Sequence, residues 1–405
     1  MTRTSCLVGT IAGMLAACGE DTAISVSATG TAGSSGPASS TTPGGSTGGT
    51  SGGVDPSGSG TGSASATTGP TPTSDPGTDT AAPGTTTNAP QTTGAASSTG
   101  AVDPGTSTGD DTTTGADVKV VRFFAIGDTG EGNESQYMVG QAIAELCAQK
   151  GCDFGLLLGD NFYDSGVSGV DDPQFQDKFE LPYEDIEVPI YVALGNHDYG
   201  GNGIGVDFDT KKAQYQVDYT KKSQLWRLPS KYYTFTQAHV ELWALDTNQV
   251  MTDPFNGNSD PQKNWLNTGV GASKATWKIA FGHHPYISNG DHGNAGAYEN
   301  LEGIPLPFVA GTNVKEFIED AMCGKVDVYI SGHDHNLQWL EPKCGTEFIV
   351  SGGGSKSEGL PGVNPAYFAE PLVEGFLWVE IEGDSFTGVF YDKTGEQLFS
   401  RVLTK

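Results

Sequence analysis

The chain has 405 residues and a formal net charge of -28 at pH 7. Its 21 lysines and arginines face 49 aspartates and glutamates, so we expect no nucleic-acid partner, because such binding depends on a basic surface. The length exceeds that of an average domain, and the composition changes sharply near residue 118.

The first 18 residues have the composition of a targeting segment. Arg3 is followed by a short apolar stretch that ends in Leu15-Ala16-Ala17-Cys18. This stretch is shorter than the roughly 20 apolar residues that cross a bilayer. Its ending resembles a bacterial lipobox, which implies a lipid anchor at Cys18 in the cell envelope. Gly19, rather than an aspartate, follows the cysteine, which favours the outer membrane; a plain secretory signal is the alternative.

Residues 19–117 are rich in Gly, Ser, Thr, Ala and Pro. They contain no Lys, Arg, Phe, Tyr or Trp. Such a segment cannot bury enough apolar surface to offset the loss of chain entropy on folding. We therefore predict a disordered linker over 19–117 and a single catalytic domain over 118–405.

Five short apolar runs in that domain each lead to a glycine and then a polar residue. Helical stretches separate several of them, which is typical of a mixed α/β domain with one buried sheet or two packed sheets. Helices are expected at 134–150 and 313–322, and extended strands within 235–245 and 376–389. The five predicted strands are 123–126, 154–158, 190–194, 277–281 and 326–330.

The polar residues that follow these strands have the chemistry of metal ligands. The five blocks contain Asp128, Asp160, Asn196, His283 and His333. Because catalytic groups of α/β sheets gather beyond the carboxyl ends of the strands, we expect these residues to meet at one edge. Imidazole nitrogen suits zinc and iron, and carboxylate oxygen suits harder ions. The number of donors predicts more than one metal ion.

The blocks resemble the calcineurin-like metallophosphoesterases and, more narrowly, the purple (tartrate-resistant) acid phosphatases. Tyr163, three residues after Asp160, carries the narrower resemblance, with support from residues 245–247, 335–338 and 351–354. The resemblance covers roughly residues 118–403. It implies a four-layer α/β/β/α sandwich, in which two packed sheets lie between layers of helices.

The resemblance also implies a ligand set for two metals. Asp128, Tyr163 and His335 would hold Fe(III), and Asp160 would bridge both ions. A divalent ion, Fe, Zn or Mn, would take the second position. Its ligands would be Asn196, His283 and His333. A phenolate on Fe(III) gives the family its purple colour by charge transfer.

Four further histidines have other expected roles. His197 and His292 match family histidines beside the substrate, and we expect both to contact phosphate and one to act as general acid. His284, which follows a ligand, is expected to be hydrogen-bonded or solvent-facing, and His239 is expected to be structural and to lie inside a strand. The neighbouring carboxylates could orient the two substrate-contacting imidazoles. These carboxylates are Asp198 and Asp334.

The expected reaction is hydrolysis of small phosphate monoesters. In this hypothesis a metal-bound hydroxide attacks phosphorus, and two cations stabilise the charge on the phosphoryl oxygens. A phosphodiesterase or nucleotidase on the same site is the nearest alternative. A non-catalytic surface lipoprotein is an alternative of another class, although it would have no need of a complete ligand set. We expect a monomer.

The four cysteines of the domain lie in two pairs along the sequence. Export to an oxidising compartment permits disulfides, so we expect Cys147–Cys152 and Cys323–Cys344, with free thiols as the alternative. Neither pair has the Cys-x-x-Cys spacing that is typical of a zinc cluster.

Overall fold

The computed structural model describes residues 119–200, 208–254, 258–301 and 307–405. The predicted leader and linker lie outside the described residues. Within the described part of the chain, no helix combines the length and the apolar character needed to cross a membrane.

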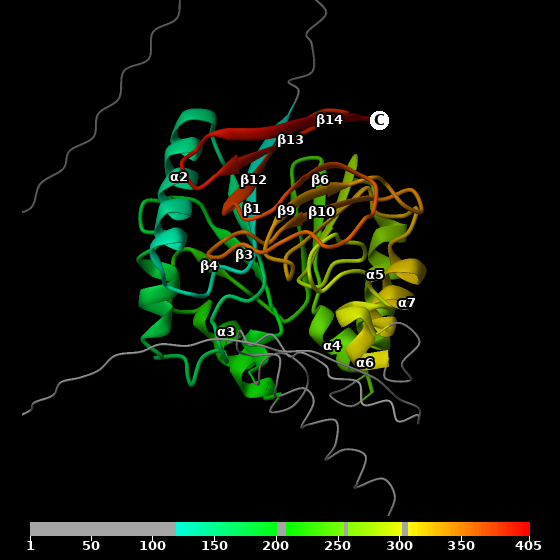
Figure 1. Cartoon of the computed structure of the whole chain (residues 1–405), viewed down its shortest axis with the longest axis horizontal. Helices are drawn as coiled ribbons and strands as arrows, with labels where there is room; N and C mark the ends of the chain where they lie inside the picture. Colours follow the sequence, from blue (N-terminus) through cyan, green and yellow to red (C-terminus); the bar gives the residue numbers. More distant parts are fainter. Residues whose placement is uncertain (1–118, 201–207, 255–257, 302–306) are drawn as a thin grey trace, which may run out of the picture. The chain divides into compact units, whose positions relative to one another are not determined.

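Seven strands form the first sheet, in the order β14-β13-β12-β1-β2-β3-β4. Neighbours from β1 to β4 are parallel, and β12 pairs with β1 in the antiparallel direction. Figure 1 shows this sheet with the helix α2 beside it. Its strands are β1 (Val120–Ile126), β2 (Phe154–Leu158), β3 (Ile190–Ala193), β4 (Trp226–Arg227), β12 (Gly375–Glu382), β13 (Ser385–Asp392) and β14 (Gln397–Thr404).

The second sheet also has seven strands, in the order β11-β9-β10-β8-β7-β6-β5. Its centre is parallel, from β6 through β7 and β8 to β10, and its edges are antiparallel. Its strands are β5 (Tyr233–Gln237), β6 (Val240–Ala244), β7 (Trp277–Phe281), β8 (Val328–Ser331), β9 (Leu337–Leu340), β10 (Glu347–Ser351) and β11 (Ala366–Glu370).

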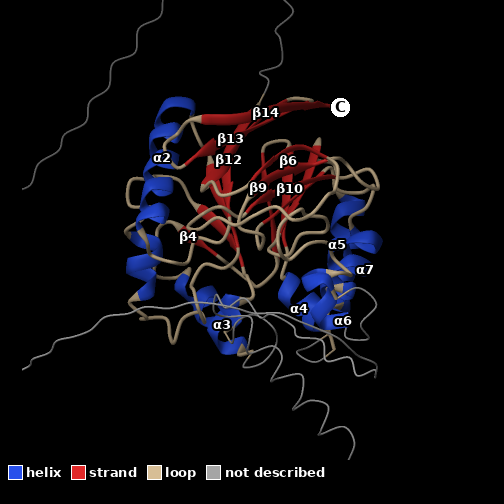
Figure 2. Cartoon of the chain, in the orientation of Figure 1, coloured by secondary structure: helices blue, strands red, loops and turns tan. Residues whose placement is uncertain are grey.

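Helices lie on the outer faces of the two sheets, and α3, α4 and α6 lie toward one end of the strands (Figure 2). Figure 2 shows α2 on one side of the strands and α5 and α7 on the other. This arrangement confirms the predicted four-layer α/β/β/α sandwich. The α-helices are α2 (Glu134–Lys150), α3 (Thr210–Tyr219), α4 (Thr247–Thr252), α5 (Asp260–Ala272), α6 (Pro307–Ala310) and α7 (Thr312–Ala321). Three shorter helical turns are η1 (Gln176–Glu180), η2 (His197–Tyr199) and η4 (Tyr298–Asn300).

The inner faces of the sheets are joined by aromatic packing. Phe154 on β2 stacks on Phe123 of β1 with ring centroids 5.0 Å apart, and its ring meets Phe235 of β5 edge-on at 5.3 Å. Such pairs contribute about 0.5–1.5 kcal/mol beyond the burial of their area. Because β2 is buried along its whole length, its sequence is a continuous apolar run rather than an alternation of apolar and polar residues.

The sequence predicted the bounds of α2 correctly, and its two ends show why. Asn133 caps its first turn by accepting a hydrogen bond from the Gln136 backbone N–H at 3.0 Å. The helix ends before Gly151, whose φ of 86° suits glycine. His239 differs from its prediction: it lies in the turn between β5 and β6, not in a strand, because the chain reverses at Ala238 with a φ of 52°.

Both predicted disulfides are confirmed. Cys147 and Cys152 join the end of α2 to the segment before β2, with their Cα atoms 5.0 Å apart. Cys323 and Cys344 join the segment after α7 to the connection between β9 and β10, with Cα atoms 5.2 Å apart.

Candidate metal centre

The two sheets meet at the carboxyl ends of their parallel strands. The backbone N–H of Gly127 donates to the Ser351 carbonyl at 2.7 Å and thereby links the end of β1 to the end of β10. Glycine is required here: a Cβ on Gly195 would lie 2.1 Å from Oδ1 of Asp160. One on Gly332 would lie 2.5 Å from Oδ2 of Asp128. The single predicted edge is therefore formed by two sheets, with β1, β2 and β3 from one and β7 and β8 from the other.

Three of the polar residues at this edge have a left-handed backbone. The φ angles are 59° at Asp128, 53° at Asp160 and 72° at His333. Non-glycine residues in this region cost on the order of 1–3 kcal/mol each and cluster at functional sites. The surrounding hydrogen bonds maintain the conformation; for example, the His333 backbone N–H donates to Oδ2 of Asp128 at 2.9 Å.

One side of the site, which we call the tyrosine half, consists of Asp128, Tyr163 and His335. The phenol of Tyr163 donates to Oδ1 of Asp128 at 3.0 Å. Nε2 of His335 lies 3.2 Å from the same phenol oxygen and 3.5 Å from Oδ1 of Asp128. All three side chains are buried, so their donor atoms face one another and not solvent.

The other side, the asparagine half, consists of Asn196, His283 and His333. Nε2 of His283 lies 2.7 Å from Oδ1 of Asn196 and 3.0 Å from Nδ1 of His333. Nδ1 of His283 lies 3.0 Å from the Leu158 carbonyl. That carbonyl favours a proton on Nδ1 and so leaves the Nε2 lone pair available to a metal.

Asp160 lies between the two halves. Its Oδ2 is 3.4 Å from Nε2 of His283. The ligand atoms of Asp160, His283 and His333 lie within 4.8 Å of one another. On its other side the carboxylate is close enough to Tyr163 to contribute to the raised pKa of the phenol.

The titration of these groups is strongly shifted. Burial alone would favour neutral imidazoles, but Asp160 raises the pKa of His283 to about 9, and Asp128 and Glu358 raise that of His335 to about 10. Burial, together with the two aspartates, raises the pKa of the Tyr163 phenol well above its usual range. Without cations between them, these donors therefore compete for protons.

The donor set fits two cations. Imidazole nitrogens, an amide oxygen, a phenol and carboxylates converge in a buried pocket, where bound cations would take the place of the shared protons. The nine residues singled out in the sequence all lie at this edge. They are Asp128, Asp160, Tyr163, Asn196, His283, His333 and His335, with His197 and His292 on the rim.

The two rim histidines are partly exposed and have different supports. The His197 backbone N–H donates to Oδ1 of Asp160 at 2.9 Å, and its Nδ1 lies 2.5 Å from the Asp164 carbonyl. The His292 ring stacks on His333 with centroids 4.0 Å apart, and its Nδ1 pairs with Glu299. Each ring can therefore face a substrate bound above the donors.

The prediction that Asp198 and Asp334 orient imidazole rings was wrong. Neither carboxylate forms a hydrogen bond with the ring that it was expected to orient. Asp198 accepts the backbone N–H groups of Gly195 at 2.7 Å and Asn161 at 3.0 Å, and so ties the loops after β3 and β2 together. Asp334 accepts the backbone N–H of His292 at 2.8 Å and so holds the loop, not the ring.

His284 was expected to be hydrogen-bonded or solvent-facing; it is buried, and one of its two ring nitrogens has a hydrogen-bond partner. It is 1% exposed, and its Nδ1 lies 2.8 Å from the Thr247 hydroxyl. Its Nε2 is buried without a hydrogen-bond partner among the described residues. Burial lowers the pKa of His284 well below its usual range, so this ring is a neutral neighbour of the donors.

Two residues near the donors were not predicted to belong to the site. Glu358 places a carboxylate oxygen 2.7 Å from Nδ1 of His335, and Lys356 places its ammonium 3.6 Å from the ring centroid of Tyr163. Both lie in a Gly-, Ser- and Pro-rich connection without periodicity. The only hint in the sequence was that both are charged residues in the connection between β10 and β11.

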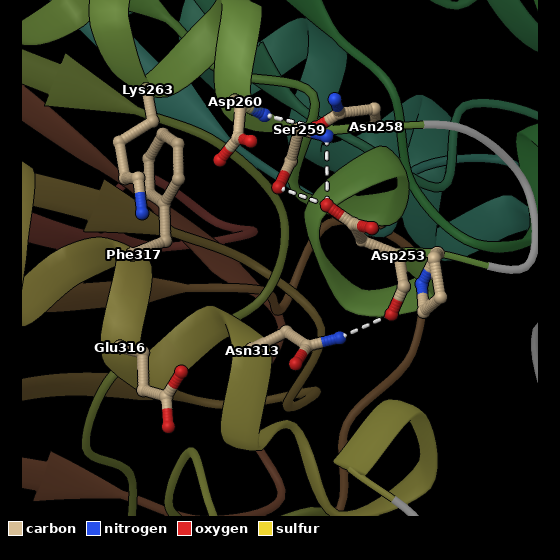
Figure 3. Close-up of a pocket in the computed structure, with 9 residues that line it drawn as sticks. Asp253, Asn258, Ser259, Asp260, Lys263, Asn313, Glu316 and Phe317 are labelled. Atoms are coloured by element: carbon tan, nitrogen blue, oxygen red, sulfur yellow. Dashed lines mark hydrogen bonds between the residues drawn. The ribbon is translucent and has the colours of Figure 1, made fainter.

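A separate hollow lies between the start of α5 and α7 (Figure 3). Asp253 there accepts the Ser259 backbone N–H at 2.8 Å, and Asn313 donates to the Asp253 carbonyl at 2.6 Å. Lys263 and Glu316 add opposite charges to its lining. It contains none of the predicted site residues, and its polar contacts brace the ends of the helices.

Known proteins share both the sequence and the fold of this domain. The chain is 29% identical over 334 residues to the tartrate-resistant acid phosphatase type 5 of Sus scrofa, covering 72% of this chain and 89% of that protein. It is 30% identical over 306 residues to purple acid phosphatase 7 of Arabidopsis thaliana, covering 70% of this chain and 86% of the relative.

Among solved structures, the fold is similar to GAP50 of Plasmodium, described as the anchor in the inner membrane complex. The TM-score is 0.56 at 23% identity, with 70% of this chain and 89% of that chain covered. This likeness concerns the fold alone. Residues 121–337 match the calcineurin-like phosphoesterase family. The chain therefore belongs to the calcineurin-like phosphoesterase family, and its relatives within it include the tartrate-resistant and purple acid phosphatases.

Proposed function

We propose that the chain hydrolyses phosphate monoesters at a dinuclear metal centre formed by the two halves and Asp160. The observation that carries the proposal is the position of Asp160, whose carboxylate lies between two sets of three donors. A carboxylate has two oxygens and can reach two ions at once. The acid phosphatases to which the chain is similar support this reading.

The two halves suit different ions. In the tyrosine half, Asp128 and Tyr163 are hard anionic oxygen donors, with His335 as the nitrogen donor. The raised pKa of the Tyr163 phenol means that only a strongly charged cation would hold it as phenolate at neutral pH. We therefore assign Fe(III) to this half. The amide and two imidazoles of the asparagine half suit a divalent ion, Fe, Zn or Mn.

When bound, two such cations would supply positive charge for the phosphoryl oxygens and a lowered pKa for the attacking water. The chain's own residues hold the substrate and move the proton. His197 and His292 face the donors from two sides of the rim and would contact the phosphate. One of them would donate a proton to the leaving alkoxide, a role worth about 10²–10⁴-fold in rate.

His292 is the stronger candidate for the proton donor. Although burial opposes its charge, Glu299 and Asp334 raise its pKa, which favours the protonated imidazole that a proton donor needs. His197 instead contacts Asp160 through its backbone N–H, a contact that orients the loop. We assign proton donation to His292 and phosphate contact to both histidines.

We further propose that the enzyme is exported and anchored through a lipid on Cys18 in the outer membrane. The two disulfides support an oxidising compartment. Replacing Cys18 by alanine in the full-length chain should move the protein from the membrane fraction to the soluble fraction. If the Cys18→Ala protein stayed in the membrane fraction, the lipid anchor would be rejected.

The function is tested by metal analysis together with a substrate panel. Purified full-length protein should contain two metal ions per chain and release phosphate from small monoesters faster than from diesters. Faster hydrolysis of diesters or nucleotides would change the substrate class on the same centre. Protein with two ions but no turnover on any ester would reject the enzymatic proposal in favour of a binding protein.

A further inference from the structure

A short segment between β10 and β11 lies along the tyrosine half. We call residues 355–358 the strap. Its members Ser355, Lys356 and Glu358 each contact a different residue of that half. No corresponding contact from the strap to Asn196, His283 or His333 is found among the described residues.

Ser355 fixes the start of the strap. Its hydroxyl, buried with the residue, donates to the Asp128 carbonyl at 2.5 Å. Its own carbonyl accepts the Asn133 side-chain amide at 2.9 Å. These two bonds attach the strap to the loop between β1 and α2, so the residues that follow start from a fixed position.

Lys356 crosses the face of Tyr163. Its ammonium lies 3.6 Å from the ring centroid and 3.0 Å from a carboxylate oxygen of Glu131. A cation over an aromatic face contributes about 0.5–2 kcal/mol, depending on desolvation. The contact holds one face of the ring, and Glu131 keeps the ammonium in place.

Glu358 contacts His335 twice. Its backbone N–H donates to the His335 carbonyl at 2.7 Å. Its Oε1 lies 2.7 Å from Nδ1 of the ring, off the N–H direction, so this is a close polar contact rather than an aligned hydrogen bond. A carboxylate at Nδ1 favours the tautomer that leaves the lone pair on Nε2, the nitrogen that faces Tyr163 and Asp128.

In the asparagine half, a backbone atom rather than a side chain contacts Nδ1 of a ligand histidine. There the Leu158 carbonyl, a backbone atom at the end of β2, lies against Nδ1 of His283. That contact cannot be removed by a side-chain substitution. Glu358 comes from a loop, and its side chain is 37% exposed, so it can be replaced without opening the core.

We propose that Glu358 is a positioning residue, which holds the His335 imidazole in the orientation and tautomer that bind the metal of the tyrosine half. This inference rests on the proposed function, because it requires a metal in that half. It predicts that the two metals of one centre depend on Glu358 to different extents.

The test compares Glu358→Gln with Glu299→Gln in the full-length chain. Both substitutions remove a carboxylate from Nδ1 of a histidine at the site, but only His335 belongs to the proposed ligand set. Each protein is dialysed against increasing concentrations of a chelator, and iron and the second metal are counted per chain. The visible charge-transfer band and the melting temperature of the metal-free protein are recorded in parallel.

We expect Glu358→Gln to lose iron at about 10–100-fold lower chelator concentration than the unsubstituted protein. The second metal and the metal-free melting temperature should stay as they are, and Glu299→Gln should keep both metals. Glu358→Asp, which restores the charge on a shorter side chain, should recover part of the iron retention.

Four results would overturn the inference. Equal iron retention in Glu358→Gln and the unsubstituted protein would reject it and leave the proposed function standing. Equal losses in both Gln variants, or a lower metal-free melting temperature in Glu358→Gln, would show a general electrostatic or structural effect. Unsubstituted protein that binds no metal would reject this inference and the proposed function together.

Discussion

The two halves of the metal centre are built from different parts of the fold and carry different charge. The tyrosine half combines a carboxylate and a phenol with one imidazole, and side chains from a loop support it. The asparagine half has no acidic ligand of its own, and the backbone at the end of β2 supports it. Asp160 is near donors of both.

In the proposed centre this difference would keep two unlike ions in separate positions. Charge would decide which half a trivalent ion occupies, because anionic oxygens stabilise it better than neutral donors do. The contacts that hold the ligand side chains decide how strongly a mutation affects metal binding in each half. The Leu158 carbonyl is a backbone atom and is not removed by a side-chain substitution. Glu358 and Lys356 are side chains that can be replaced one at a time.

The largest effect is expected from Asp160→Asn, which removes the carboxylate that both halves share. A loss of several kcal/mol of charge stabilisation corresponds to a fall in kcat of about 10³-fold or more. Metal analysis should show that both ions are lost or weakened together. Asp384→Asn is the matched control, because this exposed carboxylate follows β12 at the opposite edge of the first sheet.

Wild-type turnover in Asp160→Asn would contradict the shared bridge. Loss of only one ion would instead show that the halves bind metal independently.

The next largest effect is expected from His292→Ala, which changes neither half. Removal of the proton donor should lower kcat by about 10²–10⁴-fold and leave two metals per chain. The effect should be smaller for esters with good leaving groups, which need no proton. If His292→Ala lowered kcat equally for esters with good and poor leaving groups, His292 would not be the proton donor. The role would then be assigned to His197 or to water.

Tyr163→Phe separates the halves directly. The substitution removes the hard oxygen donor, so the tyrosine half should bind iron at least about 10-fold more weakly and the visible band should disappear. The asparagine half should keep its divalent ion. A coloured Tyr163→Phe protein would remove the phenol from the ligand set.

The raised imidazole pKa values predict proton release on metal binding. At pH 7 the metal-free protein holds protons on His283 and His335, whose pKa values are about 9 and about 10. Metals bind neutral imidazole, so each half should release an imidazole proton, and the tyrosine half should also release the Tyr163 phenol proton. The affinity of each half should therefore rise with pH above 7. Calorimetry in buffers of different ionisation enthalpy measures the release; heats that are independent of the buffer would contradict it.

The smallest effect is expected from Lys356→Met, which keeps the length of the side chain and removes its charge. The ammonium lies over the Tyr163 ring and stabilises the electrons that move to iron during charge transfer. Its removal should shift the visible band to longer wavelength with both metals retained. An unchanged band in a fully loaded protein would show that the cation does not act on the ring.

Much of this arrangement could be predicted from the sequence. The strands and α2 follow from apolar runs and caps, as at Phe154–Leu158 and Asn133. The donors follow from glycine and ligand blocks that match a known family, and that family is confirmed. The sequence does not show which block belongs to which sheet. Sheet membership depends on pairings such as that of β1 with β12, which join segments far apart in the chain.

Contacts around the donors were the least predictable part. Asp198 follows His197 in sequence, but η2 turns its carboxylate toward Gly195 and Asn161. Glu358 lies in a connection without periodicity, and only the return of β10 to the site brings it to His335. Such contacts depend on how distant segments pack, which local patterns do not encode.

The central claim is tested most directly by anomalous X-ray diffraction from crystals of the metal-loaded protein. We expect two peaks beside the Asp160 carboxylate: an iron peak next to Tyr163 and His335, and a second peak next to His283 and His333. A single peak, or two peaks that do not share Asp160, would contradict the dinuclear centre.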